Sequence, residues 1–327
     1  MGIKDEIQGT KGYMKKVRDN YLGATREMAN AAFEKYEKDK GVKLTKENIL
    51  KDIDGTLRDL LIAETSIYNE RSTKIISEVI PYYYKNFFGK NDENYPETSE
   101  YIEKMLEIYR KCSQDDYEEG NFLSDIFEIT SPVIDHISFS QKQSAKTRVG
   151  DSLQNHLEKI FEVCGIPFET QKQKDTGGTV MDFIIPHMEA MENAPDQVIN
   201  IECQTTLKDR FRLTTGKSTR ANVKRYLATA TGCGLITQRD VNDFSVDKVK
   251  EIILDNNVTL VVFKDVKKAI RIMLERHKET LIKTPDKQSI VSLQDTEKLL
   301  KLCDNKIVSF EELIKRDIQS VLVYWNK

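Results

Sequence analysis

The stretch Asn200-Ile-Glu-Cys-Gln-Thr-Thr-Leu-Lys-Asp-Arg-Phe-Arg212 combines the pattern of a buried strand with polar and charged side chains. Strand side chains alternate between two faces, so Glu202 and Gln204 are expected to share a face. Earlier in the chain, the apolar segment 179–185 carries one acid, Asp182. If the two segments pair in a sheet, Asp182 and Glu202 will converge.

The segments around this stretch predict an α/β fold. A cationic connector at 141–150 precedes an amphipathic helix that ends at Gly165. Short apolar strands separated by helices predict a mixed sheet covered by helices on both faces. The expected strands are 168–172, 179–185, 198–206, 234–238 and 259–263, the expected helices between them are 219–231 and 246–254, and residues 264–327 are expected to be helical.

The first part of the chain shows mainly helical periodicity, and we expect an N-terminal all-helical domain over residues 1–140. Gly41 is the expected end of one helix, and Thr45 is the expected cap of the next. Pro81 is expected to break a helix that begins at Ser72. Residues 141–327 then form the α/β domain with its helical C-terminal extension.

Composition limits the possible classes of protein. The chain has 327 residues, 39% hydrophobic and 31% charged, and contains no apolar run long enough to span a membrane. The polar start lacks the apolar stretch of a signal peptide, and the five cysteines show no C-x-x-C spacing. These features predict a cytoplasmic protein with reduced thiols. The net charge of −3 gives no overall sign of nucleic-acid binding, so such a site would need a local cluster of cations.

Two carboxylates on adjacent strands are typical ligands for magnesium, which prefers oxygen ligands and keeps several waters. Asp182 and Glu202 are therefore candidate metal ligands and catalytic residues, and Gln204 is a candidate for orienting the attacking water. The metal would polarise a phosphate and lower the pKa of that water. A strand Asp followed by a strand Glu also arises by chance in many α/β proteins, so the acids alone do not decide the function.

The residues after Gln204 favour a site for a phosphate backbone. Seven cations and one acid, Asp209, lie within residues 208–225, although the whole chain is negative. A solvated face usually mixes the two signs, whereas a cationic patch beside a metal site suits nucleic acid. The cations are Lys208, Arg210, Arg212, Lys217, Arg220, Lys224 and Arg225.

Four segments together resemble the catalytic domain of EcoRII-type restriction endonucleases, which have the PD-(D/E)xK nuclease fold. They are Thr147-Arg-Val-Gly-Asp-Ser-Leu-Gln-Asn-His-Leu-Glu158, Pro167-Phe-Glu-Thr-Gln171, Asp182-Phe and Gln204-Thr-Thr-Leu-Lys-Asp-Arg-Phe-Arg212. The resemblance covers roughly residues 140–265. It implies magnesium-dependent cleavage of double-stranded DNA by a homodimer. It also implies a cognate DNA methyltransferase that acts on the same site.

The resemblance also assigns roles to individual residues. Asp182 matches the metal-binding Asp of the family, and Glu158 corresponds to an accessory acid that orients a metal-bound water. Lys208, Asp209 and Arg210 match the short segment that reads adjacent C:G pairs. Arg or Lys pairs with guanine O6 and N7, and a carboxylate accepts from cytosine N4. Arg212 and Arg220 are further DNA-binding candidates, and the N-terminal helical domain is expected to extend the DNA contact or the dimer interface.

Two departures from the family pattern leave the catalytic set open. Gln204 stands where the family carries its catalytic Lys, and Lys217 stands where relatives often carry a displaced Glu, whereas Glu202 occupies the position usual for the wider fold. One hypothesis is an exchanged site, in which Lys217 or Lys208 supplies the missing cation. A second is a Glu-x-Gln site similar to that of BglII-type enzymes. A third is a weak or inactive nuclease that still binds DNA. Outside this fold family, the alternative is an interaction protein whose basic segment binds an acidic partner.

Overall fold

The computed structural model describes residues 11–83, 107–108, 110–111, 119–170, 182–204, 207, 222–231, 244–284 and 290–326. The chain forms two compact units. One contains Met1–Met28 and Ser66–Arg148, and the other contains Ala29–Thr65 and Val149–Lys327. The predicted division at residue 140 therefore falls inside a helix, α7, and residues 29–65 group with the sheet.

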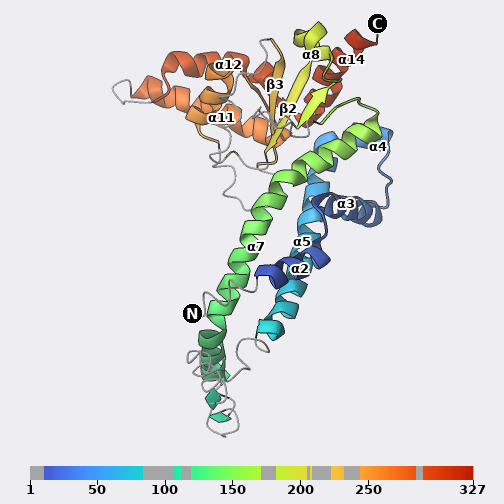
Figure 1. The fold of residues 1–327 in the computed structure, drawn as a ribbon. Helices are drawn as coiled ribbons and strands as arrows, with labels where there is room; N and C mark the ends of the chain where they lie inside the picture. Colours follow the sequence, from blue (N-terminus) through green and yellow to red (C-terminus); the bar gives the residue numbers. More distant parts are fainter. Residues whose placement is uncertain are drawn as a thin grey trace. The chain divides into compact units, whose positions relative to one another are not determined.

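The N-terminal half is helical in the residues described (Figure 1). Gly41, at φ 65°, follows the end of α3, and the Thr45 side chain accepts from the Asn48 amide at the start of α4, as predicted. Gly23 (φ 63°) separates α2 from α3. The helices are α2 (Lys11–Leu22), α3 (Thr25–Lys40), α4 (Lys46–Lys51), α5 (Ile53–Tyr83) and α7 (Glu119–Cys164).

Two predicted interruptions are wrong. Helix α5 continues through Pro81 to Tyr83; a proline in the last turn removes only one hydrogen bond of the helix. The expected connector 141–150 is part of α7, which is continuous for 46 residues. Gln, Lys and Arg have good helix propensities, so a polar and cationic sequence alone does not identify a loop. The predicted end of this helix is confirmed, because α7 stops at Cys164 and Gly165 has φ 68°.

The sheet has five strands among the described residues, in the order β1-β2-β3-β4-β5. β1 runs antiparallel to β2, and the other neighbours are parallel, so the predicted mixed sheet is confirmed. The strands are β1 (Phe183–Ile185), β2 (Ile199–Gln204), β3 (Lys224–Thr229), β4 (Thr259–Val262) and β5 (Ile307–Ser309).

The predicted helix at 219–231 is wrong, because residues 224–229 form β3 between β2 and β4. A strand buried on both faces gives a continuous apolar run, which periodicity does not separate from a buried helix. β5 was missed for the same reason in a segment expected to be helical. In the described part of the strand expected at 168–172, Glu169 makes a single antiparallel bridge with Ile184, and residues 171–172 lie outside the described residues. The predicted strand 234–238 lies outside the described residues.

The remaining helices connect and cover the strands. In Figure 1, α11 and α12 lie side by side, whereas α8 and α14 lie on the other side of β2 and β3. None of the helices in the described part of the chain could cross a membrane. These segments are α8 (Ala190–Asn193), η2 (Pro195–Gln197), α10 (Val246–Lys250), η4 (Glu251–Asp255), α11 (Lys264–Lys283), α12 (Leu293–Lys306), α13 (Phe310–Glu312), η5 (Leu313–Ile318) and α14 (Gln319–Trp325).

The two faces of the sheet pack against different apolar clusters near β1 and β2. Phe183 and Ile201 face the main core, where the Phe161 ring of α7 meets the Phe183 ring at 5.2 Å. The opposite face carries Ile184 and Val198, which pack in a smaller cluster with Ala190, Met191 and Val223. Side chains of β2 that follow Val198 with a period of two therefore point away from the main core.

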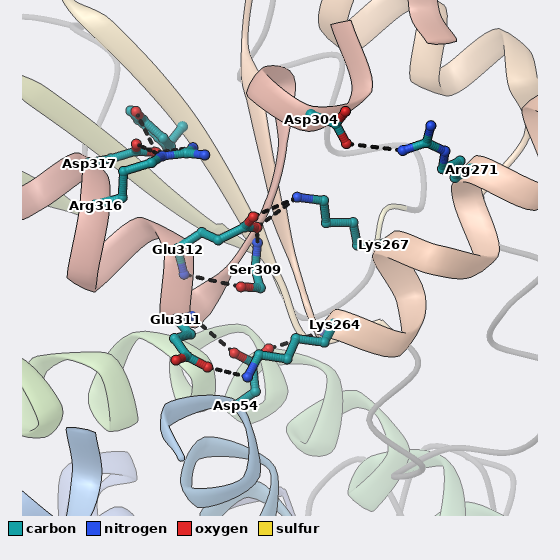
Figure 2. A network of polar contacts seen from close by, with 11 residues as sticks. Asp54, Lys264, Lys267, Arg271, Asp304, Ser309, Glu311, Glu312, Arg316 and Asp317 are labelled. Carbon is teal, nitrogen blue, oxygen red and sulfur yellow. Dashed lines mark hydrogen bonds and ion pairs between the residues drawn. The ribbon is translucent and has the colours of Figure 1, made fainter. Parts of the chain in front are cut away.

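Polar contacts tie residues 29–65 to the rest of their unit. The buried carboxylate of Asp54 accepts from the amides of Lys264 (3.1 Å) and Glu311 (3.0 Å), so one side chain caps the starts of α11 and α13 (Figure 2). Glu64 accepts from the Ser152 hydroxyl and contacts His156 Nε2, each at 2.6 Å. All of these groups lie within the unit that contains the sheet.

Candidate functional site

β2 carries a row of polar side chains on the face turned away from the main core. Ile199 and Ile201 are fully buried in that core, and the alternating positions are Asn200, Glu202 and Gln204. Asn200 is 1% exposed and Glu202 is 7% exposed, whereas Gln204 is half-buried. This row ends at the carboxyl end of β2, where ligands bind in open α/β sheets.

Asp182 lies beside this row, immediately before β1. The antiparallel register pairs Phe183 with Ile201, so one further step places Asp182 opposite Glu202. The Asp182 carboxylate accepts a hydrogen bond from the Cys203 amide at 2.6 Å. The side chain of Asp182 is thus held against the strand that bears Glu202 and Gln204, and the structure brings the two predicted acids to one edge of the sheet.

The electrostatics of this edge favour a bound cation. Burial raises the pKa of Asp182 to about 6, the hydrogen bond from Cys203 opposes this rise, and the nearby charge of Asp151 adds to it. Burial, together with Asp182 and Glu202, also raises the pKa of the Cys203 thiol well above its usual range. A group whose neighbours resist its ionisation is a candidate for a functional role. A cation bound beside Asp182 would favour its ionised form.

Asp151 was missed by the sequence reasoning, which selected Glu158 on the same helix. The acid of α7 whose charge acts on Asp182 is Asp151, and it is exposed. Glu158 is half-buried two turns further along α7. Residues seven apart share a helix face, so this spacing could have identified Asp151 as a second candidate.

The two carboxylates fit a hard divalent cation such as magnesium. Their oxygen atoms are the ligands that magnesium prefers, and magnesium usually needs only one or two carboxylates because it keeps several waters. Within the described residues there is no group of three or more His, Cys, Asp or Glu side chains that could hold a metal.

The predicted DNA-binding residues cannot be placed by the structure. Lys208, Asp209, Arg210, Arg212 and Arg220 all lie outside the described residues, and so does Lys217, which was predicted as a catalytic residue. Lys224 and Arg225, the end of the same cationic run, form the start of β3. Arg225 pairs in register with Asn200, so its side chain lies on the face that carries Glu202. One cation of the run is therefore positioned beside the polar row.

A cavity of about 570 Å³ lies elsewhere, at the carboxyl ends of β4 and β5. Six basic and three acidic side chains line it, but the acids pair with the bases (Figure 2). Lys267 contacts Glu312 at 2.8 Å, and Arg271 contacts Asp304 at 3.1 Å. Its acids neutralise three of its six bases, and the cavity contains none of the residues that the sequence predicted for the site.

Comparison with known sequences identifies the family. Residues 107–282 match the family model described as EcoRII C terminal, which is more than half of the chain. The chain belongs to the EcoRII C-terminal family. The match extends beyond the predicted region 140–265 at both ends. No curated protein sequence matches the chain significantly.

Solved structures of restriction endonucleases share the fold of this EcoRII-type chain. Metal-depleted Ecl18kI in complex with uncleaved, modified DNA has a TM-score of 0.61 and 15% identity, and the match covers 98% of this chain and 86% of that one. The restriction endonuclease PspGI in complex with substrate DNA has a TM-score of 0.56 and 15% identity, with 94% and 96% covered. The predicted α/β fold of the PD-(D/E)xK type, with a helical N-terminal region, is thereby confirmed.

Proposed function

We propose that this chain is a type II restriction endonuclease that uses magnesium to hydrolyse phosphodiester bonds in double-stranded DNA. The observation that carries the proposal is the placement of Asp182 opposite Glu202 at the end of β2 in a fold of this family. The two structural neighbours are DNA complexes, which supports double-stranded DNA as the partner.

Asp182 and Glu202 would hold the magnesium ion, which supplies polarisation of the phosphate and activation of a water. Gln204 follows Glu202 on the same face, where its amide would orient the attacking water. An amide is too weak a base to remove the proton from that water. Lys217 or Lys208 would supply the positive charge that the catalytic Lys supplies elsewhere in the family. Glu158 would act as an accessory acid that orients a water.

Sequence recognition belongs to the segment after β2 in this proposal. Lys208 and Arg210 would pair with guanine, and Asp209 would accept from cytosine N4, which predicts a recognition site with C:G pairs. Arg212 and Arg220 would contact phosphates. We further propose a cytoplasmic homodimer, with the N-terminal helices extending the DNA contact or the dimer interface. A cognate methyltransferase would act on the same DNA site.

Digestion of a plasmid of known sequence in the presence of magnesium tests the proposal. Wild-type protein should give discrete fragments, and Asp182→Ala and Glu202→Ala should each abolish cleavage. Asp196→Ala, at an exposed position in η2, makes the same chemical change away from the site and should cleave normally. Retained cleavage by the Asp182 or Glu202 variant would refute the assignment of the metal ligands.

The second candidate function is sequence-specific DNA binding with weak or no catalysis. It is favoured by Gln204, which stands where the family carries a catalytic Lys. Gln204→Lys distinguishes the two: a decayed site should gain cleavage from the lysine, whereas an adapted Glu-x-Gln site should lose or keep its activity. The measurement is the initial rate of plasmid cleavage at saturating magnesium.

A further inference from the structure

Glu64 is a buried carboxylate on α5 that the proposed function leaves unused. It is 7% exposed, and its hydrogen-bond partners among the described residues both lie on α7. The Ser152 hydroxyl donates to Glu64 Oε2, and His156 Nε2 contacts the same oxygen, each at 2.6 Å. A buried carboxylate is costly unless it finds donors. Glu64 takes the donors described for it from one turn of α7.

These two contacts fix the rotation of α7. Ser152 and His156 are four residues apart, so they lie on one face of the helix. A shift of α7 by one residue would turn this face by about 100° and take both donors away from Glu64. The His156 ring also meets the Phe33 ring of α3 edge-on at 5.3 Å, which holds the imidazole in place.

The turn that Glu64 holds is the one that carries Asp151, whose charge acts on Asp182. Apolar packing brings α7 to the sheet, because Leu157 lies in the same core cluster as Phe183, the residue after Asp182. Apolar contacts are non-directional, whereas hydrogen bonds are directional. The hydrogen bonds to Glu64 therefore select which side of the helix faces α5 and on which side Asp151 lies.

We infer that Glu64 is a positioning residue that fixes the rotation of α7 and thereby holds the charge of Asp151 beside Asp182, where it favours the binding of a divalent cation. The inference rests on the proposed function, because it needs a metal ion at Asp182. Asp151 belongs to no group of three acids among the described residues that could hold a metal, so it would act on the cation by its charge rather than as a ligand.

The test measures calcium binding to the full chain by isothermal titration calorimetry, which does not depend on cleavage. Residues that support a metal site without binding the metal typically change its affinity by 10–100-fold, and we expect about tenfold weaker binding for Asp151→Asn. Glu64→Leu removes the acceptor while filling its space, and it should weaken binding by up to the same factor. Because Glu64 acts through Asp151, the double variant should bind as weakly as Asp151→Asn and no weaker.

Asp54→Ala is the matched control for a loss of stability. Asp54 is a second buried carboxylate of α5, but its donors are the starts of α11 and α13, so this variant should keep the calcium affinity of the wild-type protein. Ser152→Ala removes one donor to Glu64 and leaves the other, and it should weaken calcium binding by a smaller factor than Glu64→Leu. If Glu64→Leu does not fold, Ser152→Ala decides the test.

Two results would overturn the inference while the proposed function stands. One is wild-type calcium affinity in Glu64→Leu and Ser152→Ala, which would make Glu64 only a structural link between two helices. The other is a double variant in which the effects of Glu64→Leu and Asp151→Asn multiply, because Glu64 would then act by another route. If the wild-type protein neither binds calcium nor cleaves DNA with magnesium, the proposed function fails, and this inference fails with it.

Discussion

Two carboxylates of the same unit, buried Asp54 and half-buried Asp182, differ in the hydrogen-bond donors around them. Burial raises the pKa of both. Asp54 accepts from two backbone amides, those of Lys264 and Glu311, which lower its pKa again. Asp182 accepts from one amide, that of Cys203, and the charge of Asp151 works against its ionisation.

The difference separates a structural carboxylate from a candidate catalytic one. Asp54 finds its hydrogen-bond donors in the chain, and in doing so it joins α5 to the starts of α11 and α13. Among the described residues, Asp182 accepts one hydrogen bond and the charge of Asp151 opposes its ionisation, so a bound cation would stabilise its ionised form. Stability is given up at such sites in exchange for function. Three substitutions of carboxylates or their partners test this reading.

The largest effect is expected for Asp54→Ala, which leaves two buried backbone amides without an acceptor. Hydrogen bonds to a charged group contribute about 1.5–3 kcal/mol each, so we expect the free energy of unfolding to fall by about 4 kcal/mol in urea denaturation. Asp52→Ala is the matched control, because Asp52 is exposed and accepts from one backbone amide, that of Gly55, among the described residues. Loss of this helix cap should lower the free energy of unfolding by about 1 kcal/mol. Equal losses of stability for the two variants would show that Asp54 stabilises the fold no more than an exposed helix cap does.

The opposite sign is expected for Asp182→Asn. The pKa of this carboxyl is about 6 in the folded chain, against an ordinary value of 3.8. Ionisation therefore costs the folded state more than the unfolded state, and wild-type stability falls as pH rises from about 4 to 6. Asn does not ionise, and its side-chain oxygen can still accept from Cys203.

In metal-free buffer the Asp182→Asn variant should match wild-type protein below about pH 4 and be more stable by up to about 3 kcal/mol above pH 7. The measurement is urea denaturation across this range with a chelator present. A stability difference that does not change with pH would contradict the reading of Asp182 as a destabilised acid. Added calcium should stabilise the wild-type protein and leave the variant unchanged, because the variant lacks one metal ligand.

The sequence could predict the strand that carries Glu202 and the mixed character of the sheet, because alternation and short apolar runs are local signals. It could not predict that residues 224–229 are a strand, because burial on both faces removes the alternation. Nor could it predict that α7 continues through 141–150, where polarity resembled that of a loop.

The candidate site divides in the same way. The pairing of Asp182 with Glu202 was predictable, because both acids lie on apolar segments whose pairing brings them together. The influence of Asp151 was not, because it depends on where α7 packs against the sheet. That Asn200 has no hydrogen-bond partner among the described residues was also hidden, since nothing local in a sequence reports whether a polar side chain finds a partner.

Asp317 accepts hydrogen bonds from a neutral phenol and from a charged arginine. Tyr226→Phe should show the smallest of the three effects on stability. The Tyr226 hydroxyl donates to Asp317 at 3.1 Å, and Arg316 also donates to Asp317 through its Nε at 2.6 Å. Burial, together with the charge of Asp317, raises the pKa of the Tyr226 phenol far above its usual range. Loss of the hydroxyl leaves the carboxylate with its arginine, so no buried charge is stranded.

We therefore expect Tyr226→Phe to lower the free energy of unfolding by about 1 kcal/mol, the usual contribution of one hydrogen bond. Arg316→Met provides the comparison, because it removes the charged partner of Asp317 and leaves the phenol. A larger loss of stability for Arg316→Met, in denaturation at neutral pH, would show that Asp317, like Asp54, is stabilised by partners within the chain. A loss of several kcal/mol for Tyr226→Phe would instead mean that the hydrogen bond from the phenol stabilises the fold more than the ion pair between Arg316 and Asp317 does.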